Sequence, residues 1–218
     1  MDKEGIKQLA EQLRKPSGEK GKEVAEMMNE TNISMTIQSI QNLNLKKEDW
    51  VMEIGYGNAG HLKFLFEFAD QIKYSGYDIS ELMQSEAIRL NQDFMKNHWA
   101  EFKLYDGQNF PEDDGKFDKI FTVNTLYFWE NPNKMLSEIY RILKPGGVFC
   151  LTFVEKDFMK LLPFSSFGFT MYDPEDVEEL VKNSDFRLEK MIRDTELVKN
   201  KLGEKMNRQF ATVVLRKF

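Results

Sequence analysis

The sequence predicts a single α/β domain built on a seven-stranded, mostly parallel sheet, with a helical extension at its N-terminus. From Trp50 onward, short apolar runs alternate with amphipathic stretches, which is typical of βαβ units. A glycine-rich segment lies between the first apolar run and the first amphipathic stretch. Near the chain end, two strand-like runs follow each other directly, which suggests an antiparallel pair that closes the sheet with its last strand antiparallel.

The first 49 residues are polar and helical in pattern, and we expect them to form a helical cap on a domain of residues 50–218. Two apolar stripes at helical spacing support this reading: Ile6, Leu9 and Leu13, then Ile33, Ile37 and Ile40. Between them, residues 15–18 read Lys-Pro-Ser-Gly, and this sequence predicts a break in the helix.

Seven runs after the cap have the composition of buried strands: 51–54, 72–77, 100–104, 117–123, 148–154, 186–193 and 210–216. Helices are expected between them. Ser80 is a candidate N-cap for a helix with Met83, Ala87, Leu90 and Phe94 on its buried face. Asn131-Pro132 and Asp173-Pro174 begin two further helices. The polar stretch 194–208 is expected to be a solvated loop.

Composition excludes several classes of function. The chain has 218 residues and a net charge of −6, which argues against a broad phosphate-binding surface and hence against a nucleic-acid partner. A single cysteine and two histidines leave no metal site of the Cys- or His-cluster kind. No apolar run approaches the roughly 20 residues that cross a bilayer, and the N-terminus has no apolar signal region. The expected compartment is therefore the cytoplasm.

The glycine-rich segment 53–60, Glu-Ile-Gly-Tyr-Gly-Asn-Ala-Gly, is the strongest functional signal. Gly55, Gly57 and Gly60 permit a tight turn and close approach of a ligand, and the following helix offers free N–H groups. Asp78 ends the next strand, where a carboxylate can hold a ribose diol. The motif therefore predicts a cofactor that contains adenosine, without deciding which one.

Three features help to choose between cofactors. Glu53 lies near the carboxyl edge of the sheet, where it would repel a pyrophosphate and accept the cationic end of an amino acid. Asp106 begins an Asp-Gly turn and either accepts from the amino group of adenine or only forms the turn. A polar residue and aromatics, Asn124 to Trp129, end the fourth strand, where open α/β sheets bind ligands.

Several segments resemble class I S-adenosylmethionine-dependent methyltransferases, a Rossmann-like family. Residues 51–57 resemble its first motif, and 77–80 with Met83 resemble its acidic second motif. Residues 117–120 and 141–147 resemble the fourth strand and the turn before the fifth. The likeness extends from about Trp50 to Val154 and is greatest to the type 11 group, near the quinone-biosynthesis C-methyltransferases. One departure is Ala59, which stands where the family usually has a third glycine.

The resemblance implies S-adenosyl-L-methionine as cofactor and a set of binding residues. Glu53, Gly55 and Gly57 would hold its methionine end, Asp78 the ribose, Asp106 with Gly107 the adenine, and Asn124 the amino group through its carbonyl. The full set of expected cofactor-binding residues is Glu53, Gly55, Tyr56, Gly57, Asp78, Ile79, Met83, Asp106, Gly107, Gln108 and Asn124.

The acceptor is expected to be a small, apolar or aromatic molecule. Residues 158–172 are rich in aromatics and follow the fifth strand, so they would either cover an apolar acceptor site or pack as ordinary core. Candidate acceptor contacts are Tyr127, Phe164, Phe167 and Tyr172. No catalytic residue is identified, because methyl transfer needs a general base only if the acceptor must lose a proton. His61 is expected to be a partly exposed helix residue.

Two other functions remain open at this point. The same glycine loop serves NAD(P)-dependent oxidoreductases, although Glu53 and the absence of an evident substrate domain disfavour that reading. A catalytically silent module that binds the cofactor would have the same sequence features. The sequence does not specify the acceptor, the methylated element (carbon, nitrogen or oxygen) or the oligomeric state.

Overall fold

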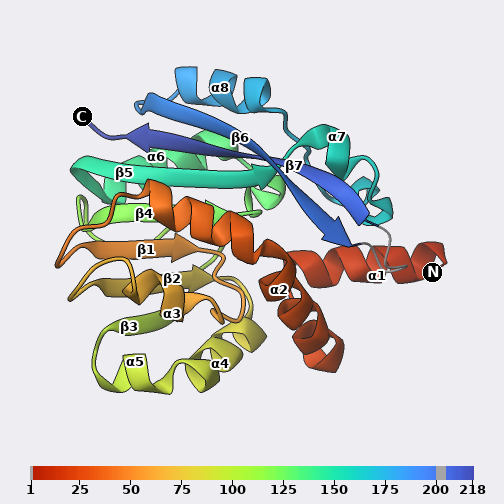
Figure 1. Ribbon diagram of the computed structural model, residues 1–218, viewed down its shortest axis with the longest axis horizontal. Coiled ribbons are helices and arrows are strands. Elements are labelled where there is room, and N and C mark those ends of the chain that lie inside the picture. The colour runs from red at the N-terminus through yellow and green to blue at the C-terminus, as the bar shows by residue number, and fades with distance from the viewer. Residues whose placement is uncertain (1, 200–204) are drawn as a thin grey trace.

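The computed structural model describes residues 2–199 and 205–218, and in this part of the chain seven strands form one sheet (Figure 1). The strand order is β3-β2-β1-β4-β5-β7-β6. β7 is antiparallel to both of its neighbours, and all other adjacent pairs are parallel. The predicted seven-stranded sheet with an antiparallel last strand is confirmed.

The strands are β1 (Trp50–Ile54), β2 (Lys73–Asp78), β3 (Ala100–Leu104), β4 (Phe117–Val123), β5 (Leu143–Val154), β6 (Arg187–Lys199) and β7 (Lys205–Arg216). The α-helices are α1 (Lys3–Arg14), α2 (Gly18–Asn42), α3 (Leu62–Phe66), α4 (Glu81–Leu90), α5 (Gln92–Lys96), α6 (Pro132–Ile142), α7 (Lys156–Met159) and α8 (Pro174–Lys182). Two short 3₁₀ helices are η1 (Leu126–Phe128) and η2 (Pro163–Ser166).

Helices cover both faces of the sheet. One apolar cluster joins α6 and α8 to residues such as Met52 and Ile54, and the other joins α3, α4 and part of α2 to Val51 and Tyr74. Val51 and Met52 belong to different clusters because successive side chains of a strand point to opposite faces. Glu53 is therefore on the same face as Val51, beside α3.

The expected helix signals act as predicted. Ser80 accepts a hydrogen bond from the Met83 amide at 3.2 Å, and Asn131 accepts one from the Lys134 amide at 3.0 Å, so both cap their helices. α1 ends at Arg14 and α2 begins at Gly18, on either side of the predicted break. α2 then runs to Asn42 and packs on β4 and β5.

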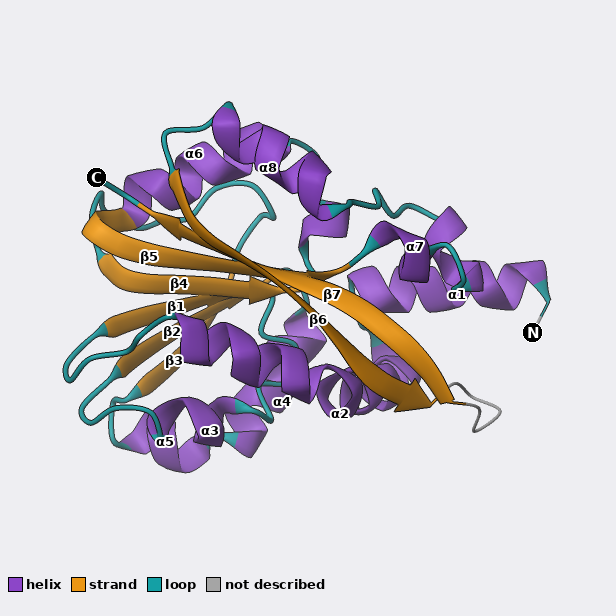
Figure 2. Cartoon of the chain, turned by 45° about the horizontal axis from the view of Figure 1, so that its top comes forward, coloured by secondary structure: helices purple, strands orange, loops and turns teal. Residues whose placement is uncertain are grey.

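Two expectations about local structure are wrong. Residues 194–199 and 205–208 are strand and not loop, since β6 continues to Lys199 and β7 begins at Lys205, with pairs from Asp194–Phe210 to Lys199–Lys205. The rest of the predicted loop, residues 200–204, lies outside the described part. Figure 2 shows this hairpin extending past the rest of the sheet toward α2. Its polar side chains suggested a loop, yet a ribbon with much of its surface in solvent needs few apolar residues. Leu90 is 46% exposed, because the helix ends there and α5 starts after Asn91.

None of the helices within residues 2–199 and 205–218 combines the length and the hydropathy of a membrane-crossing segment.

Candidate functional site

Two adjoining cavities lie where the parallel strands end. The first, about 360 Å³, is lined by the residues that follow β1, β2, β3 and β4 and by parts of α1 and α2. The second, about 990 Å³, lies under α1, α7, η2 and the extended β6–β7 hairpin. Open α/β sheets bind ligands at this edge because the loops after the strands converge there. All eleven of the residues expected to bind a cofactor line the first cavity.

The glycine turn forms the floor of the first cavity. Gly55 has φ +74° and a Cβ there would lie 2.4 Å from Cγ2 of Thr125, so only glycine fits. Gly57 has φ +57°, and a Cβ there would meet no atom within 4 Å, so its backbone faces open space. Ala59 also adopts a left-handed conformation, with φ +51°, and is fully buried. The turn therefore forms with Ala59 in place of a third glycine.

The Glu53 carboxylate is buried beside this turn, at 3% exposure. Its Oε2 accepts a hydrogen bond from the Tyr74 hydroxyl at 2.5 Å and lies 2.8 Å from Nε2 of His61. The expectation that His61 is partly exposed is wrong. The residue is 6% exposed, because its ring hydrogen-bonds to the buried Glu53 carboxylate. Both Glu53 and His61 line the cavity, so the pair presents a fixed polar surface to a ligand.

Asp78 provides a second buried carboxylate. The backbone N–H groups of Gly57 and Ser80 donate to its two oxygens at 3.1 and 2.9 Å. Burial raises the pKa of Asp78 to about 6, opposed by these backbone hydrogen bonds and assisted by the nearby charge of Glu53. The carboxylate thus ties the end of β2 to the glycine turn and is predominantly ionised above about pH 6.

Two residues that line the first cavity each carry a buried polar atom with no hydrogen-bond partner among the described residues. These atoms belong to the hydroxyl of Tyr56 and the indole N–H of Trp129, whose residues are 2% and 7% exposed. A buried polar atom without a partner costs roughly 1–3 kcal/mol. The wall of the first cavity therefore carries an energetic cost at these two residues.

The turn after β3 forms the opposite wall. One oxygen of Asp106 accepts from the amides of Gln108 and Asn109, both at 2.7 Å, and the other accepts from the Asn109 side chain at 2.8 Å. These bonds lower the pKa of Asp106 below its usual value. Gly107 has φ +85° and packs over Ile79. Asp106 therefore forms the turn, and its exposed carboxylate remains ionised as a potential acceptor.

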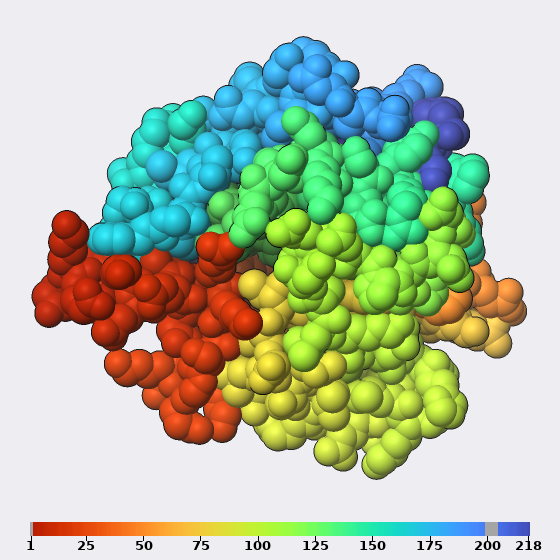
Figure 3. Space-filling view, turned by 180° about the vertical axis from the view of Figure 1, so that it is seen from behind, coloured from red at the N-terminus to blue at the C-terminus, as the bar shows by residue number. Residues whose placement is uncertain are grey.

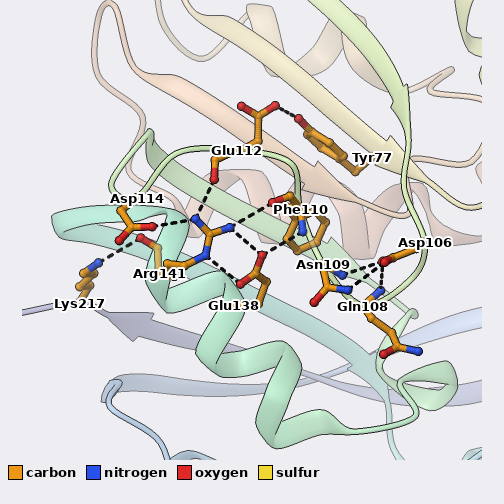
Figure 4. Close-up of polar contacts among 10 residues, drawn as sticks. All are labelled: Tyr77, Asp106, Gln108, Asn109, Phe110, Glu112, Asp114, Glu138, Arg141 and Lys217. Atoms are coloured by element: carbon orange, nitrogen blue, oxygen red, sulfur yellow. Dashed lines mark hydrogen bonds and ion pairs between the residues drawn. The ribbon is translucent and has the colours of Figure 1, made fainter.

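Arg141 of α6 fixes the loop that carries this turn (Figure 4). Its guanidinium donates to the carbonyl oxygens of Phe110 at 3.0 Å and Glu112 at 2.7 Å, and to Asp114 at 2.7 Å. Glu138 receives two further bonds from it and accepts from the Phe110 amide at 2.9 Å. One planar cation thereby holds the backbone at several points, as guanidinium geometry permits.

Asn124, with φ +60°, directly follows β4 and lies at the boundary between the two cavities. Its Oδ1 accepts from the Tyr127 hydroxyl at 2.8 Å and from the Val154 amide at 3.2 Å. The side-chain oxygen thus links the end of β4 to η1 and β5, and Asn124 lines both cavities. Tyr127, an expected acceptor contact, lines the second cavity.

Apolar side chains dominate the lining of the second cavity. The segment after β5 contributes Phe158, Met159, Leu161, Leu162, Pro163, Phe164 and Phe169. Phe167 and Tyr172 line neither cavity. Phe167 follows the end of η2, where the chain leaves the short helix, and Tyr172 is buried in the core cluster around α8. The aromatic segment therefore combines a cavity wall with ordinary core packing.

The N-terminal helices connect the two cavities. Leu13, Met28 and Asn32 line both, together with Asn124 and Phe128. In the space-filling view the N-terminal helices lie between the cyan segment that follows β5 and the yellow region of β2 and α4 (Figure 3). Met28 and Asn32 lie where the sequence suggested a second cover of the acceptor site, whereas the hairpin residues Val198, Met206 and Arg208 carried no motif, because only the tertiary fold brings them to the site.

Comparisons with known proteins agree with this architecture. Residues 52–151 match the family described as "Methyltransferase domain". The chain is 26% identical over 121 residues to an uncharacterized methyltransferase, YdaC, of Bacillus subtilis, a match that covers 56% of this chain and 65% of that protein. It is 28% identical over 102 residues to a fatty-acid O-methyltransferase of Mycolicibacterium smegmatis, covering 47% and 36%. The matches span less than two thirds of the length of either relative.

A solved structure is similar over nearly the whole chain. It is the methyltransferase described as putative in complex with the Haloferax volcanii Trm112 methyltransferase activator, with a TM-score of 0.72, 16% identity, and coverage of 97% of this chain and 96% of that one. At this identity the likeness concerns the fold alone, and it includes the N-terminal helices and the hairpin as well as the central sheet.

Arg141→Met is expected to loosen the loop between β3 and β4. Loss of the hydrogen bonds to Phe110, Glu112 and Asp114 should speed amide hydrogen exchange in residues 106–114 and lower the free energy of unfolding by about 2 kcal/mol. Arg89→Met is the matched control, since Arg89 pairs only with Glu86 one helical turn away. Equal exchange rates in the two variants would show that Arg141 does not hold the loop.

Proposed function

We propose that this chain, a member of the class I S-adenosylmethionine-dependent methyltransferases, transfers a methyl group from S-adenosylmethionine in the first cavity to an apolar small molecule in the second. The observation that carries the proposal is the direct junction of the two cavities at Met28, Asn32 and Phe128. A cavity that contains two buried carboxylates, beside one lined mainly by apolar side chains, suits a charged donor and an apolar acceptor that must meet at one point.

The residues of the first cavity fit the cofactor. Glu53 would face the cationic amino group of its methionine end, and the open backbone of Gly57 leaves room for close approach. Asp78 would accept from the ribose hydroxyls. A pyrophosphate would instead meet the buried Glu53 carboxylate, which disfavours a nicotinamide dinucleotide.

When bound, S-adenosylmethionine supplies a methyl group on a positively charged sulfur. The chain's own contribution is alignment and the exclusion of water. Phe128 and Asn124 lie at the junction and would hold donor and acceptor in line. α1, α2 and the segment after β5 enclose the acceptor side. An acceptor that is already nucleophilic would need no general base for this transfer.

An apolar acceptor follows from the lining of the second cavity. Its size, about 990 Å³, lies in the range of cavities that hold small organic ligands. The fatty-acid O-methyltransferase among the relatives is named for an acceptor with a long apolar chain, which supports an apolar acceptor here.

Affinity for S-adenosylhomocysteine should depend on the ionisation of Asp78. Because the pKa of Asp78 is raised to about 6, the carboxylate is protonated as the pH falls through that value and loses its capacity to accept two ribose hydroxyls. Affinity is expected to be full above about pH 7 and to fall by up to tenfold for each pH unit below about 6. Calorimetric titration of S-adenosylhomocysteine at a series of pH values above and below the pKa of Asp78 measures this change in affinity.

Asp78→Ala should make the binding free energy of S-adenosylhomocysteine less favourable by about 2–4 kcal/mol at neutral pH, which is the scale of lost charge-assisted hydrogen bonds. Asp49→Asn is the control, because Asp49 is also buried but lines neither cavity. Unchanged affinity in Asp78→Ala, or NADH binding in place of S-adenosylhomocysteine, would refute the assignment. Methyl transfer to a metabolite extract separates an enzyme from a silent binding module.

Phe164→Ala should slow methyl transfer to an apolar acceptor and leave cofactor affinity within about twofold, because Phe164 lines only the second cavity. Phe167→Ala is the matched control from the same segment, since Phe167 lines neither cavity. Rates and melting temperatures are measured on the same samples. A Phe164→Ala variant that melts many degrees lower and loses cofactor binding would assign this ring to core packing instead.

A further inference from the structure

Arg208 places a nearly buried positive charge in the wall of the apolar cavity. It lies on β7 in the extended part of the hairpin, is 7% exposed, and lines the second cavity. A buried cation is costly unless it is paired or hydrogen-bonded. An apolar acceptor alone gives no reason for a guanidinium at this position.

The hydrogen bonds of Arg208 leave part of its capacity unused. Nε and Nη2 donate to Oε1 of Glu196 at 3.0 and 2.6 Å, and Nη2 also donates to the Thr31 carbonyl. Among residues 2–199 and 205–218, the contact of Nη1 is a long one of 3.4 Å to Oδ1 of Asn32. A guanidinium has five N–H donors, so at least one N–H on Nη1 has no partner in these contacts.

The charge of the cavity wall has one sign. Among the described residues that line the second cavity, the charged ones are Lys205 and Arg208, and the acidic partner Glu196 is not a lining residue. Asn32, which contacts Arg208, lines both cavities, so the guanidinium is close to the junction. A ligand in this cavity therefore meets an extensive apolar surface with a positive group near its inner end.

We infer that the acceptor is an amphiphile with an apolar body and an anionic head, and that Arg208 binds this head. The inference rests on the proposed function and adds a charge requirement to it. Carboxylates and phosphates share the geometry that a guanidinium recognises, so either can serve as the head. Arg208 acts here as a specificity-determining residue, and its ion pair with Glu196 keeps it in place before the ligand binds.

Calorimetric titration with three probes of equal chain length tests this inference. Dodecanoate and dodecyl phosphate carry an anionic head and 1-dodecanol does not; each is used below the concentration at which it aggregates. The wild-type chain should bind at least one of the anions about tenfold or more tightly than the alcohol. The two anionic arms distinguish a carboxylate head from a phosphate head.

Two substitutions should act in opposite directions. Arg208→Gln should remove about tenfold of the affinity for the anion and leave the alcohol unchanged. Glu196→Gln should raise the affinity for the anionic probe by roughly threefold, because Arg208 loses the carboxylate that competes with the probe. Arg187→Gln, which removes a cation at the other end of the same hairpin, is the control and should have no effect.

If Arg208→Gln fails to fold, two results still test the inference. They are the direction in which Glu196→Gln changes the affinity for the anion, and the preference of the wild-type chain for an anion over 1-dodecanol. Equal binding of anion and alcohol, or weaker anion binding in Glu196→Gln, would overturn the inference. S-adenosylhomocysteine is titrated into every variant. Normal binding of it beside absent or charge-independent binding of the probes rejects the anionic acceptor alone, whereas failure to bind it at all rejects the proposed function.

Discussion

Two carboxylates buried side by side at the carboxyl edge of the sheet impose the main constraint on this structure. Within the described residues, neither Glu53 nor Asp78 forms an ion pair with a lysine or arginine. Burial of uncompensated charge is unfavourable, and the raised pKa of Asp78 reflects this. Tyr74 and His61 hold one carboxylate, and the backbone amides of the glycine turn and the start of α4 hold the other.

The local geometry follows from keeping these groups in position. Gly76, which pairs with Glu53 across β1 and β2, has no side chain because a Cβ there would lie 2.5 Å from the ring of Tyr56. At Gly55 the backbone passes so close to Thr125 that a side chain would clash, whereas the backbone of Gly57 faces open space where a ligand can approach. A molecule with a cationic amino group and two adjacent hydroxyls would compensate both carboxylates, which is why a nucleoside joined to an amino acid suits the cavity better than a diphosphate.

The central sheet and the elements added to it contribute different halves of the proposed site. Motif residues after β1, β2 and β3 form much of the first cavity, and the sequence predicted them because each follows a buried strand and has a distinctive spacing. The apolar cavity is made by α1, α2, the segment after β5 and the hairpin. The aromatic content of the segment after β5 predicted Phe164 as a cavity residue. It equally predicted Phe167 and Tyr172, which line neither cavity, because composition alone does not specify which way each ring points. Arg208 could not be anticipated, because its segment reads as a polar loop until strand pairing is known.

The methyl group of a bound donor should emerge where the two cavities meet. Met28 lines both cavities, Met83 lines only the first, and Met95 lines neither. With isotope labels on the S-methyl group of S-adenosylmethionine and on the methionine methyls of the protein, nuclear Overhauser contacts report which side chains the transferable methyl approaches. We expect a contact with Met28 and none with Met95. A contact with Met83 in place of Met28 would contradict this expectation, because the methyl group would then point away from the acceptor cavity.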